Sequence, residues 1–421
     1  KLCRQFGISY TSCQRALKKI EQNGVVKIVR GSGIFLAGGD SLPVDFYAPE
    51  TTFDPVRLQA LLTELSVKND LNLDIIVRDK HQLNFHAVSE SPGRVVITED
   101  DTWIRREGVM LDYSSFPDYP ELTAQFQTFG EKFNNLKLPF YCVTTQGVFN
   151  TAILKRIGMT VPETVTLGSP WWNELIEKCR KSGCFPANKE SYNENLWNFP
   201  CLIPAILMHP GNCRRADELF NVPVFDTPQG ERLFEIMQDF APCADLYQAF
   251  YEGNTAVALQ FGSWLSTQFR RYPGLKAEDF RVFPLKCRSR KVIPYTISAL
   301  TTFLNGPLKK NEAERIWTFL KLLLNKENQK KIAAMSGCLS LRRDMKPADH
   351  EWACREDFLE FFPAPGDLLI NREILSNEEK VALGVLYEQF STYGAPSALI
   401  RKCMDNKLAL RHRRNLHPAE K

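Results

Sequence analysis

The spacing of apolar residues near the start of the chain predicts a single amphipathic helix. Between Tyr10 and Asn23, apolar side chains recur at three- and four-residue intervals, which is the period of one helix face. Ser9 suits the amino-terminal cap, because its hydroxyl can accept an unsatisfied amide. Gly24 suits the left-handed position that ends a helix. The apolar face is formed by Cys13, Ala16, Leu17 and Ile20.

Directly after this helix, two short apolar runs predict a β-hairpin. The runs are Val25–Val29 and Ile34–Leu36, and they are joined by the four residues Arg30, Gly31, Ser32 and Gly33. Glycines at this position allow a tight turn between antiparallel strands. The hairpin would carry a basic side chain at its tip.

From residue 43 onward, strand-like and helix-like segments alternate. Such alternation predicts βαβ units and a mainly parallel sheet, so the fold class is α/β. We expect a short helix or turn around Leu83–Glu90. The expected strands are Val44–Tyr47, Leu73–Val77 and Arg94–Thr98, and the expected helix is Pro55–Val67.

Two loops follow strands of this predicted sheet and are candidates for ligand contact. Ligands of parallel sheets bind at the carboxyl ends of the strands. The first loop, Ala48–Asp54, contains Phe53, and the second, Glu99–Trp103, contains Asp101 and Trp103. Asp101 has a second interpretation as the cap of a following helix.

Length and composition indicate a soluble globular protein of two or three domains. The chain has 421 residues, of which 44% are hydrophobic and 24% charged, and no apolar run approaches the roughly 18 residues of a membrane span. The opening residues, KLCRQFGISY, do not resemble a signal peptide.

Basic charge is concentrated in the first 38 residues. Seven Lys and Arg against one Glu give this segment +6, which leaves −2 for the rest of a chain whose total is +4. This asymmetry predicts a small anion-binding module on a near-neutral body, with phosphate backbones as its partner.

The cysteines and histidines suggest neither a metal site nor a disulfide framework. Twelve cysteines are scattered along the chain without a CxxC motif, and we interpret them as reduced thiols of a cytosolic protein. No nucleophile or phosphate-loop motif points to an enzyme, and we expect no metal and no cofactor.

The amino-terminal segment resembles the winged helix-turn-helix of the GntR family of transcription regulators, lacking that family's first residues. The resemblance implies a partial DNA-binding domain over residues 1–38. Tyr10 and Gln14 replace two arginines usual in the family, so operator preference should differ. A basic surface helix unrelated to DNA is the alternative. The matching positions are Gly7-Ile8-Ser9, Ala16-Leu17, Glu21, Gly24, Gly31 and Gly33-Ile34-Phe35. The expected DNA contacts are Ser9, Tyr10, Thr11, Ser12, Gln14, Arg15 and Lys18 on the helix, and Arg30, Gly31, Ser32 and Gly33 on the wing.

Residues 43–410 resemble family 1 extracellular solute-binding proteins, the carbohydrate receptors of ABC importers. The resemblance implies a two-lobed, type II periplasmic-binding-protein-like body, with crossovers near 140–145 and 280–300 and a ligand in the interlobe cleft. Leu339-Ser340 departs from the family's hydrophobic-Pro pair in the segment 312–344. The matching positions are Pro139, Tyr141, Phe149-Asn150, Gly158, Pro162-Glu163-Thr164, Trp172-Asn173-Glu174-Leu175, Gly253, Ala256, Ala258, Gly262 and Trp264.

Sugar sites combine aromatic platforms with hydrogen-bonding side chains. Trp264 lies in the family's cleft segment, and either ligand contact or core packing fits it. Trp172 and Trp317 have helical apolar spacing and are expected in the core. The full set of candidate ligand contacts is Trp264, Trp103, Asp101, Tyr141, Trp197 and Tyr295.

Together these patterns predict a cytoplasmic, homodimeric transcription regulator that binds a double-stranded DNA operator and senses a mono- or oligosaccharide. The alternative is an extracytoplasmic carbohydrate-binding receptor of an ABC importer, with an accidental amino-terminal match. An enzyme built on the same body is a third reading.

Overall fold

The structure is a computed structural model of the whole chain. It describes residues 9–22, 26–29, 33–36, 41–50, 52–80, 94–99, 109–131, 133–162, 165, 169–189, 226–228, 231, 241–242, 250–262, 265, 276–287, 290–304, 306, 308–353, 355–371, 398, 401–403 and 405–406. The segment Leu83–Glu90, where a helix or turn was expected, lies outside these residues.

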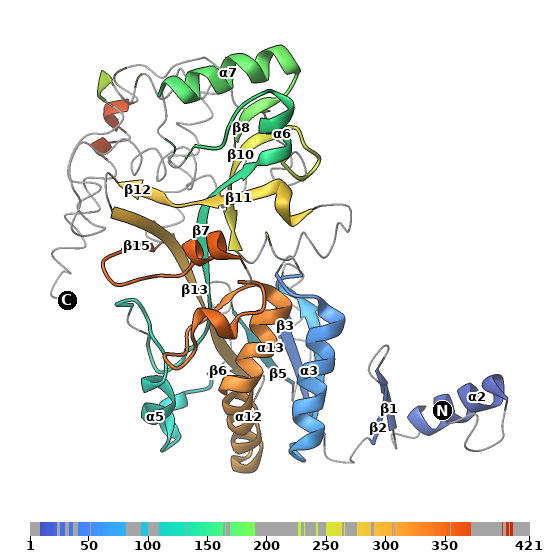
Figure 1. Cartoon of the computed structure of the whole chain (residues 1–421). Helices are drawn as coiled ribbons and strands as arrows, with labels where there is room; N and C mark the ends of the chain where they lie inside the picture. The colour runs from blue at the N-terminus through green and yellow to red at the C-terminus, as the bar shows by residue number, and fades with distance from the viewer. Residues whose placement is uncertain are drawn as a thin grey trace, which may run out of the picture. The chain divides into compact units, whose positions relative to one another are not determined.

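The amino-terminal helix and hairpin form as the sequence predicts. Helix α2 spans Tyr10–Gln22, and strands β1 (Val26–Val29) and β2 (Gly33–Leu36) pair antiparallel (Figure 1). Cys13 is buried, and its amide donates to the Ser9 carbonyl at 2.9 Å. A single helix and a two-stranded hairpin are formed by local interactions, so they report little about the rest of the fold.

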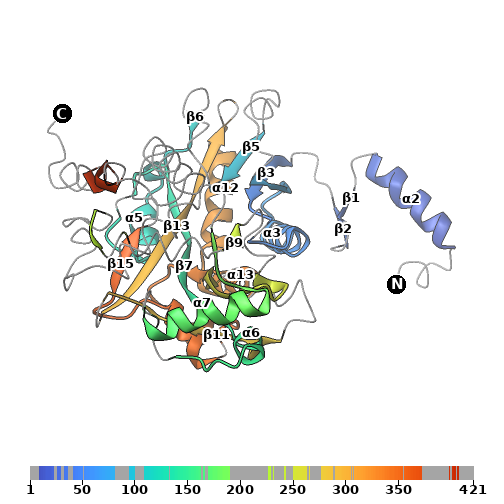
Figure 2. The same ribbon diagram turned by 90° about the horizontal axis from the view of Figure 1, so that it is seen from above.

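The whole chain divides into two compact units. Unit 1 comprises residues 1–142 and 297–352, and unit 2 comprises residues 143–296 and 353–421. The unit boundaries at 142/143 and 296/297 fall inside two long strands, β7 (Leu138–Asn150) and β13 (Arg290–Leu304), which are neighbours in the sheet (Figures 1 and 2).

Unit 1 is built on a parallel core of three strands. Strand β3 (Leu42–Ala48) pairs parallel with both β4 (Leu73–Asp79) and β5 (Val95–Thr98). The end of β13 continues the sheet antiparallel to β5 and to β6 (Val109–Met110). The predicted strands over 44–47, 73–77 and 94–98 are therefore confirmed to within two residues at each end.

Helix α3 (Pro55–Lys68) has the local features that start and orient a helix. The Asp54 carboxylate caps it by accepting from the amides of Val56 and Arg57 at 2.9 and 3.2 Å, and Pro55 occupies the first turn. Its buried face packs against β4 and against two later helices (Figure 1). The buried residues are Leu58, Leu61, Leu62, Leu65 and Ser66.

Two further helices, α12 (Lys310–Leu323) and α13 (Lys326–Ser336), contact α3 and each other. Trp317 on α12 is buried, as its helical spacing predicts. Its ring stacks on Phe116 at 4.7 Å between centroids. The other described elements of unit 1 are η2 (Tyr113–Ser115), α5 (Tyr119–Ala124), β14 (Leu339–Ser340) and η6 (Pro347–Asp349).

Unit 2 is organised around the second half of β7. This strand pairs antiparallel with β10 (Thr255–Phe261) and β11 (Phe280–Phe283), and β10 pairs parallel with β8 (Phe185–Lys189). The other elements are α6 (Thr151–Arg156), α7 (Pro170–Ser182), β9 (Ala241–Pro242), η5 (Ala277–Asp279), β12 (Leu285–Cys287), η7 (Glu356–Phe361) and β15 (Leu368–Asn371).

The register of β7 against β11 places Gly147 opposite Phe283. A Cβ atom at position 147 would lie 2.0 Å from Phe283 Cζ, inside the space that the ring occupies. The same ring packs at 4.3 Å from that of Phe149. The absence of a side chain at Gly147 thus lets an aromatic residue fill the core of unit 2. Trp172 on α7 is also buried, as predicted.

Candidate functional site

The carboxyl ends of β3 and β5 bring together an aromatic and a carboxylate side chain in unit 1. Phe53 lies in the loop after β3, and Glu99 directly follows β5. Tyr141 on β7 contacts both: its ring lies 5.5 Å from that of Phe53, and its hydroxyl donates to Glu99 Oε2 at 2.7 Å. Parallel sheets bind ligands at this edge.

Tyr141 is a neutral hydrogen-bond donor in this cluster. Burial, followed by the nearby Glu99 charge, raises the pKa of its phenol far above the ordinary value. Only 2% of Tyr141 is exposed, so we assign it the role of positioning Glu99. Glu99 is half-buried and is the more accessible residue of the pair.

The remaining sequence candidates fall into two groups. Tyr295 is buried on β13, where it is paired in register with Asn371 of β15, within unit 2. Asp101, Trp103, Trp197 and Trp264 lie outside the described residues. The sequence analysis did not predict Glu99 as a ligand contact. Its position immediately after a predicted strand could have indicated it.

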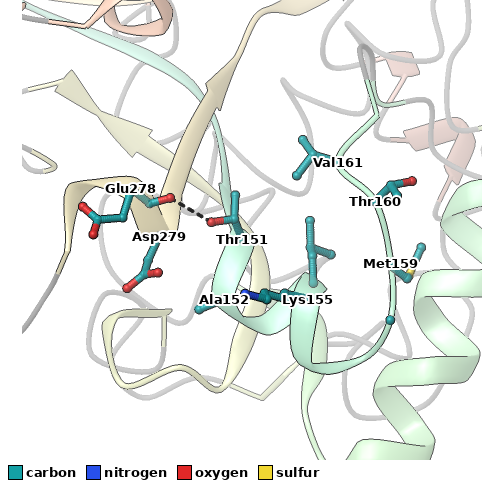
Figure 3. Close-up of a pocket in the computed structure, with 10 residues that line it drawn as sticks. Thr151, Ala152, Lys155, Met159, Thr160, Val161, Glu278 and Asp279 are labelled. Carbon is teal, nitrogen blue, oxygen red and sulfur yellow. Dashed lines mark hydrogen bonds between the residues drawn. The ribbon is translucent and has the colours of Figure 1, made fainter.

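Unit 2 contains a separate cavity of about 590 Å³ beside α6 (Figure 3). Glu278 and Asp279 of η5 lie on one side of the helix and the Met159–Val161 segment on the other. The Thr151 hydroxyl donates to the Glu278 carbonyl at 3.0 Å and joins α6 to η5. Sequence analysis gave no sign of this cavity, because its walls come from segments more than 100 residues apart.

The walls of this cavity are held by hydrogen bonds outside it. Arg355 donates to the carbonyls of Ala277 and Phe280, the latter at 2.7 Å, which fixes both ends of η5. Lys178 donates to the Gly158 carbonyl at 2.8 Å and fixes the segment after α6. Among the described residues, those that line the cavity are aliphatic, polar or charged, and none of them is aromatic.

Within the described ranges, no group of three or more His, Cys, Asp or Glu side chains is arranged to hold a metal ion. Among those same residues, no helix has the length and apolar character needed to cross a bilayer.

Comparison with solved structures identifies proteins of similar fold. One is a cyclic α-maltosyl-1,6-maltose binding protein from Arthrobacter globiformis, with 15% identity, a TM-score of 0.60, and coverage of 89% of this chain and 99% of that chain. A second is an ABC transporter solute binding protein from Thermotoga lettingae bound with α-D-tagatose, at 12% identity, TM-score 0.62, and 89% and 100% coverage. A third is a family 1 extracellular solute-binding protein from Bifidobacterium longum subsp. infantis, at 16% identity, TM-score 0.56, and 88% and 100% coverage.

These likenesses define the class of fold. The chain has the mixed α/β, two-lobed fold of solute-binding proteins, and the body predicted from the sequence is confirmed at that level. No family model matches the sequence, and no curated protein sequence matches it. The names of these neighbours describe binding proteins and bound small molecules.

The prediction of a DNA-binding transcription regulator is wrong. The structural likeness covers 88–91% of this chain and 98–100% of each neighbour. Several of those neighbours are named as solute-binding or sugar-binding proteins, and one as a solute binding protein of an ABC transporter. An amino-terminal winged helix-turn-helix domain is not shown, and the neighbours support neither a DNA operator nor a homodimer as partner.

Because a DNA partner is not supported, the DNA contacts expected of individual residues have no basis either. Gln14, Arg15 and Lys18 are exposed on α2, which is ordinary for the charged face of a surface helix. Ser9 precedes α2; Tyr10, Thr11 and Ser12 lie in it; Gly33 begins β2; and Arg30, Gly31 and Ser32 lie outside the described residues. The expected cytoplasmic location is corrected too, because neighbours are described as secreted or extracellular.

Proposed function

We propose that this chain is the extracytoplasmic solute-binding receptor of an ABC importer and that its solute is a mono- or oligosaccharide. The observation that carries the proposal is the extent of the fold likeness, which spans nearly the whole of each neighbour. Several of those neighbours have names or bound molecules that are sugars. Fold alone does not choose a ligand, so the proposal also needs a site.

We place one part of the solute site at the carboxyl edge of the unit 1 sheet. The Glu99 carboxylate accepts hydrogen bonds, and sugar hydroxyls are donors of the matching kind. Tyr141 holds this carboxylate at 2.7 Å, which fixes it before a ligand arrives. Asp101 and Trp103 follow Glu99 closely in the sequence, and we propose them as further contacts of this part of the site, with Tyr141 as the residue that positions Glu99. From the sequence resemblance alone, we also propose Trp264, Trp197 and Tyr295 as solute contacts.

A binding screen on the purified full-length chain tests the function. Mono-, di- and oligosaccharides are added one at a time, and the melting temperature and heat of binding are measured. A true ligand at a hundredfold excess over its Kd stabilises the folded chain by about 2.7 kcal/mol, which is visible as a higher Tm.

Variants then test the site. We expect Glu99→Gln to weaken sugar binding by at least about tenfold, because hydrogen bonds to a charged group contribute roughly 1.5–3 kcal/mol. Glu314→Gln is the matched control, since Glu314 lies on the exposed face of α12 in the same unit. Equal affinity of both variants and the parent would remove Glu99 from the site.

A further inference from the structure

Helix α7 ends in a turn that brings two cysteines together. Gly183 adopts the left-handed conformation, with φ of 67°. The amides of Gly183 and Cys184 both donate to the Cys179 carbonyl, the latter at 3.1 Å. A hydrogen bond from the sixth residue back to the first defines the Schellman motif, in which the side chains of those two residues usually make an apolar contact.

In this chain that contact is made by two thiols. Cys179 is 0% and Cys184 5% exposed, and both are free thiols here. Burial, followed by the neighbouring Cys184 thiol, raises the pKa of the Cys179 thiol. The turn at the end of α7 therefore brings the side chains of Cys179 and Cys184 to the two positions that usually contact each other in this motif.

We propose that Cys179 and Cys184 form a disulfide when the protein folds in an oxidising compartment. The proposal rests on the extracytoplasmic location proposed above, because disulfides form and persist in such compartments. The two thiols lose two protons and two electrons to a small-molecule disulfide such as oxidised glutathione. That oxidant is reduced to two thiols as the new sulfur–sulfur bond forms.

The bond would tie the end of α7 to the start of β8. Both sulfurs are buried in the folded chain, so oxidation takes place during folding, while the thiols are still accessible. The loop that the bond closes is short, and a short loop removes little entropy from the unfolded chain. We therefore expect the oxidised protein to melt only about 2–5 °C above the reduced protein.

Tryptic digestion gives a direct assay, because Arg180 and Lys181 lie between the two cysteines. The full-length chain is refolded with oxidised and reduced glutathione or with dithiothreitol, alkylated at low pH, digested and analysed by mass spectrometry. With glutathione we expect the dipeptide Cys179–Arg180 to remain joined to the peptide Ser182–Lys189. With dithiothreitol both peptides should be separate and alkylated.

Variants separate this pair from the other cysteines. Cys179→Ala and Cys184→Ala should each abolish the joined peptides, whereas Cys403→Ser, which removes an exposed thiol elsewhere, should leave them intact. Recovery of both peptides as separate alkylated species after glutathione refolding would overturn the proposal. A chain that binds sugars without this bond would refute only the disulfide, and a bonded chain that binds no solute would refute only the proposed function.

Discussion

His350 is held in unit 1 as a neutral imidazole by two backbone groups. Its Nδ1 lies 3.0 Å from the Lys346 carbonyl, so this nitrogen carries the proton, and its Nε2 accepts the Ser340 amide at 3.1 Å. Burial lowers the pKa of this imidazole below its ordinary value. Protonation of Nε2 would remove the acceptor for a buried amide.

This tautomer predicts a pH-dependent loss of stability. In the unfolded chain, His350 binds a proton near its ordinary pKa of about 6.5. In the folded chain, the lowered pKa means that protonation requires a lower pH. The stability contribution is therefore complete above about pH 6.5 and decreases as the pH falls through the lowered folded pKa. Urea unfolding at pH 7.5 and 5.5 should show a smaller pH dependence for His350→Gln than for the parent. An equal decrease in both would contradict the assignment.

Gly147 supports a second residue-level prediction. We expect Gly147→Ala to destabilise the fold by about 1–3 kcal/mol, the range typical of overpacking, because the new methyl group collides with the Phe283 ring. Urea unfolding measures the change. Phe283→Leu in the Gly147→Ala background should recover part of it, since the smaller side chain leaves room. A double variant that is less stable than the sum of the two single changes would argue against this contact.

At the scale of elements, the local sequence predicted which helices and strands form. It did not predict which residues from distant segments come into contact. The strands β3, β4 and β5 and the helix α3 were predicted closely, because apolar period, a capping Asp54 and Pro55 act within a few residues. The Tyr141–Glu99 hydrogen bond joins residues 42 positions apart, and only the sheet topology brings them together. The cavity beside α6 could not be predicted either, because its walls also come from segments that are distant in the sequence.

The cap of α3 gives a prediction at this scale. Asp54→Ala removes the acceptor for two amides and should cost about 1 kcal/mol in urea unfolding, whereas Asp54→Asn should cost little, because Asn caps helices about as well as Asp. If both substitutions cost the same, the charge of Asp54 rather than its capping geometry would be what stabilises α3.

At the scale of the whole molecule, the sequence led to two inferences of unequal value. The solute-binding body rested on several motifs spread over residues 43–410, and the fold bears it out. The prediction of a transcription regulator was based on only 38 residues. Their glycines, helix cap and basic charge occur in an ordinary surface helix and hairpin as well as in a DNA-binding one. Local agreement of that kind specifies a helix and a hairpin without specifying a partner.

The most direct test of the central claim is calorimetric titration of the purified full-length chain with the sugar that most raises its Tm. We predict saturable one-to-one binding, weakened at least about tenfold by Glu99→Gln and unchanged by Glu314→Gln. Absence of saturable binding to every mono- and oligosaccharide tested, with a chain that unfolds cooperatively, would contradict the assignment as a carbohydrate-binding receptor.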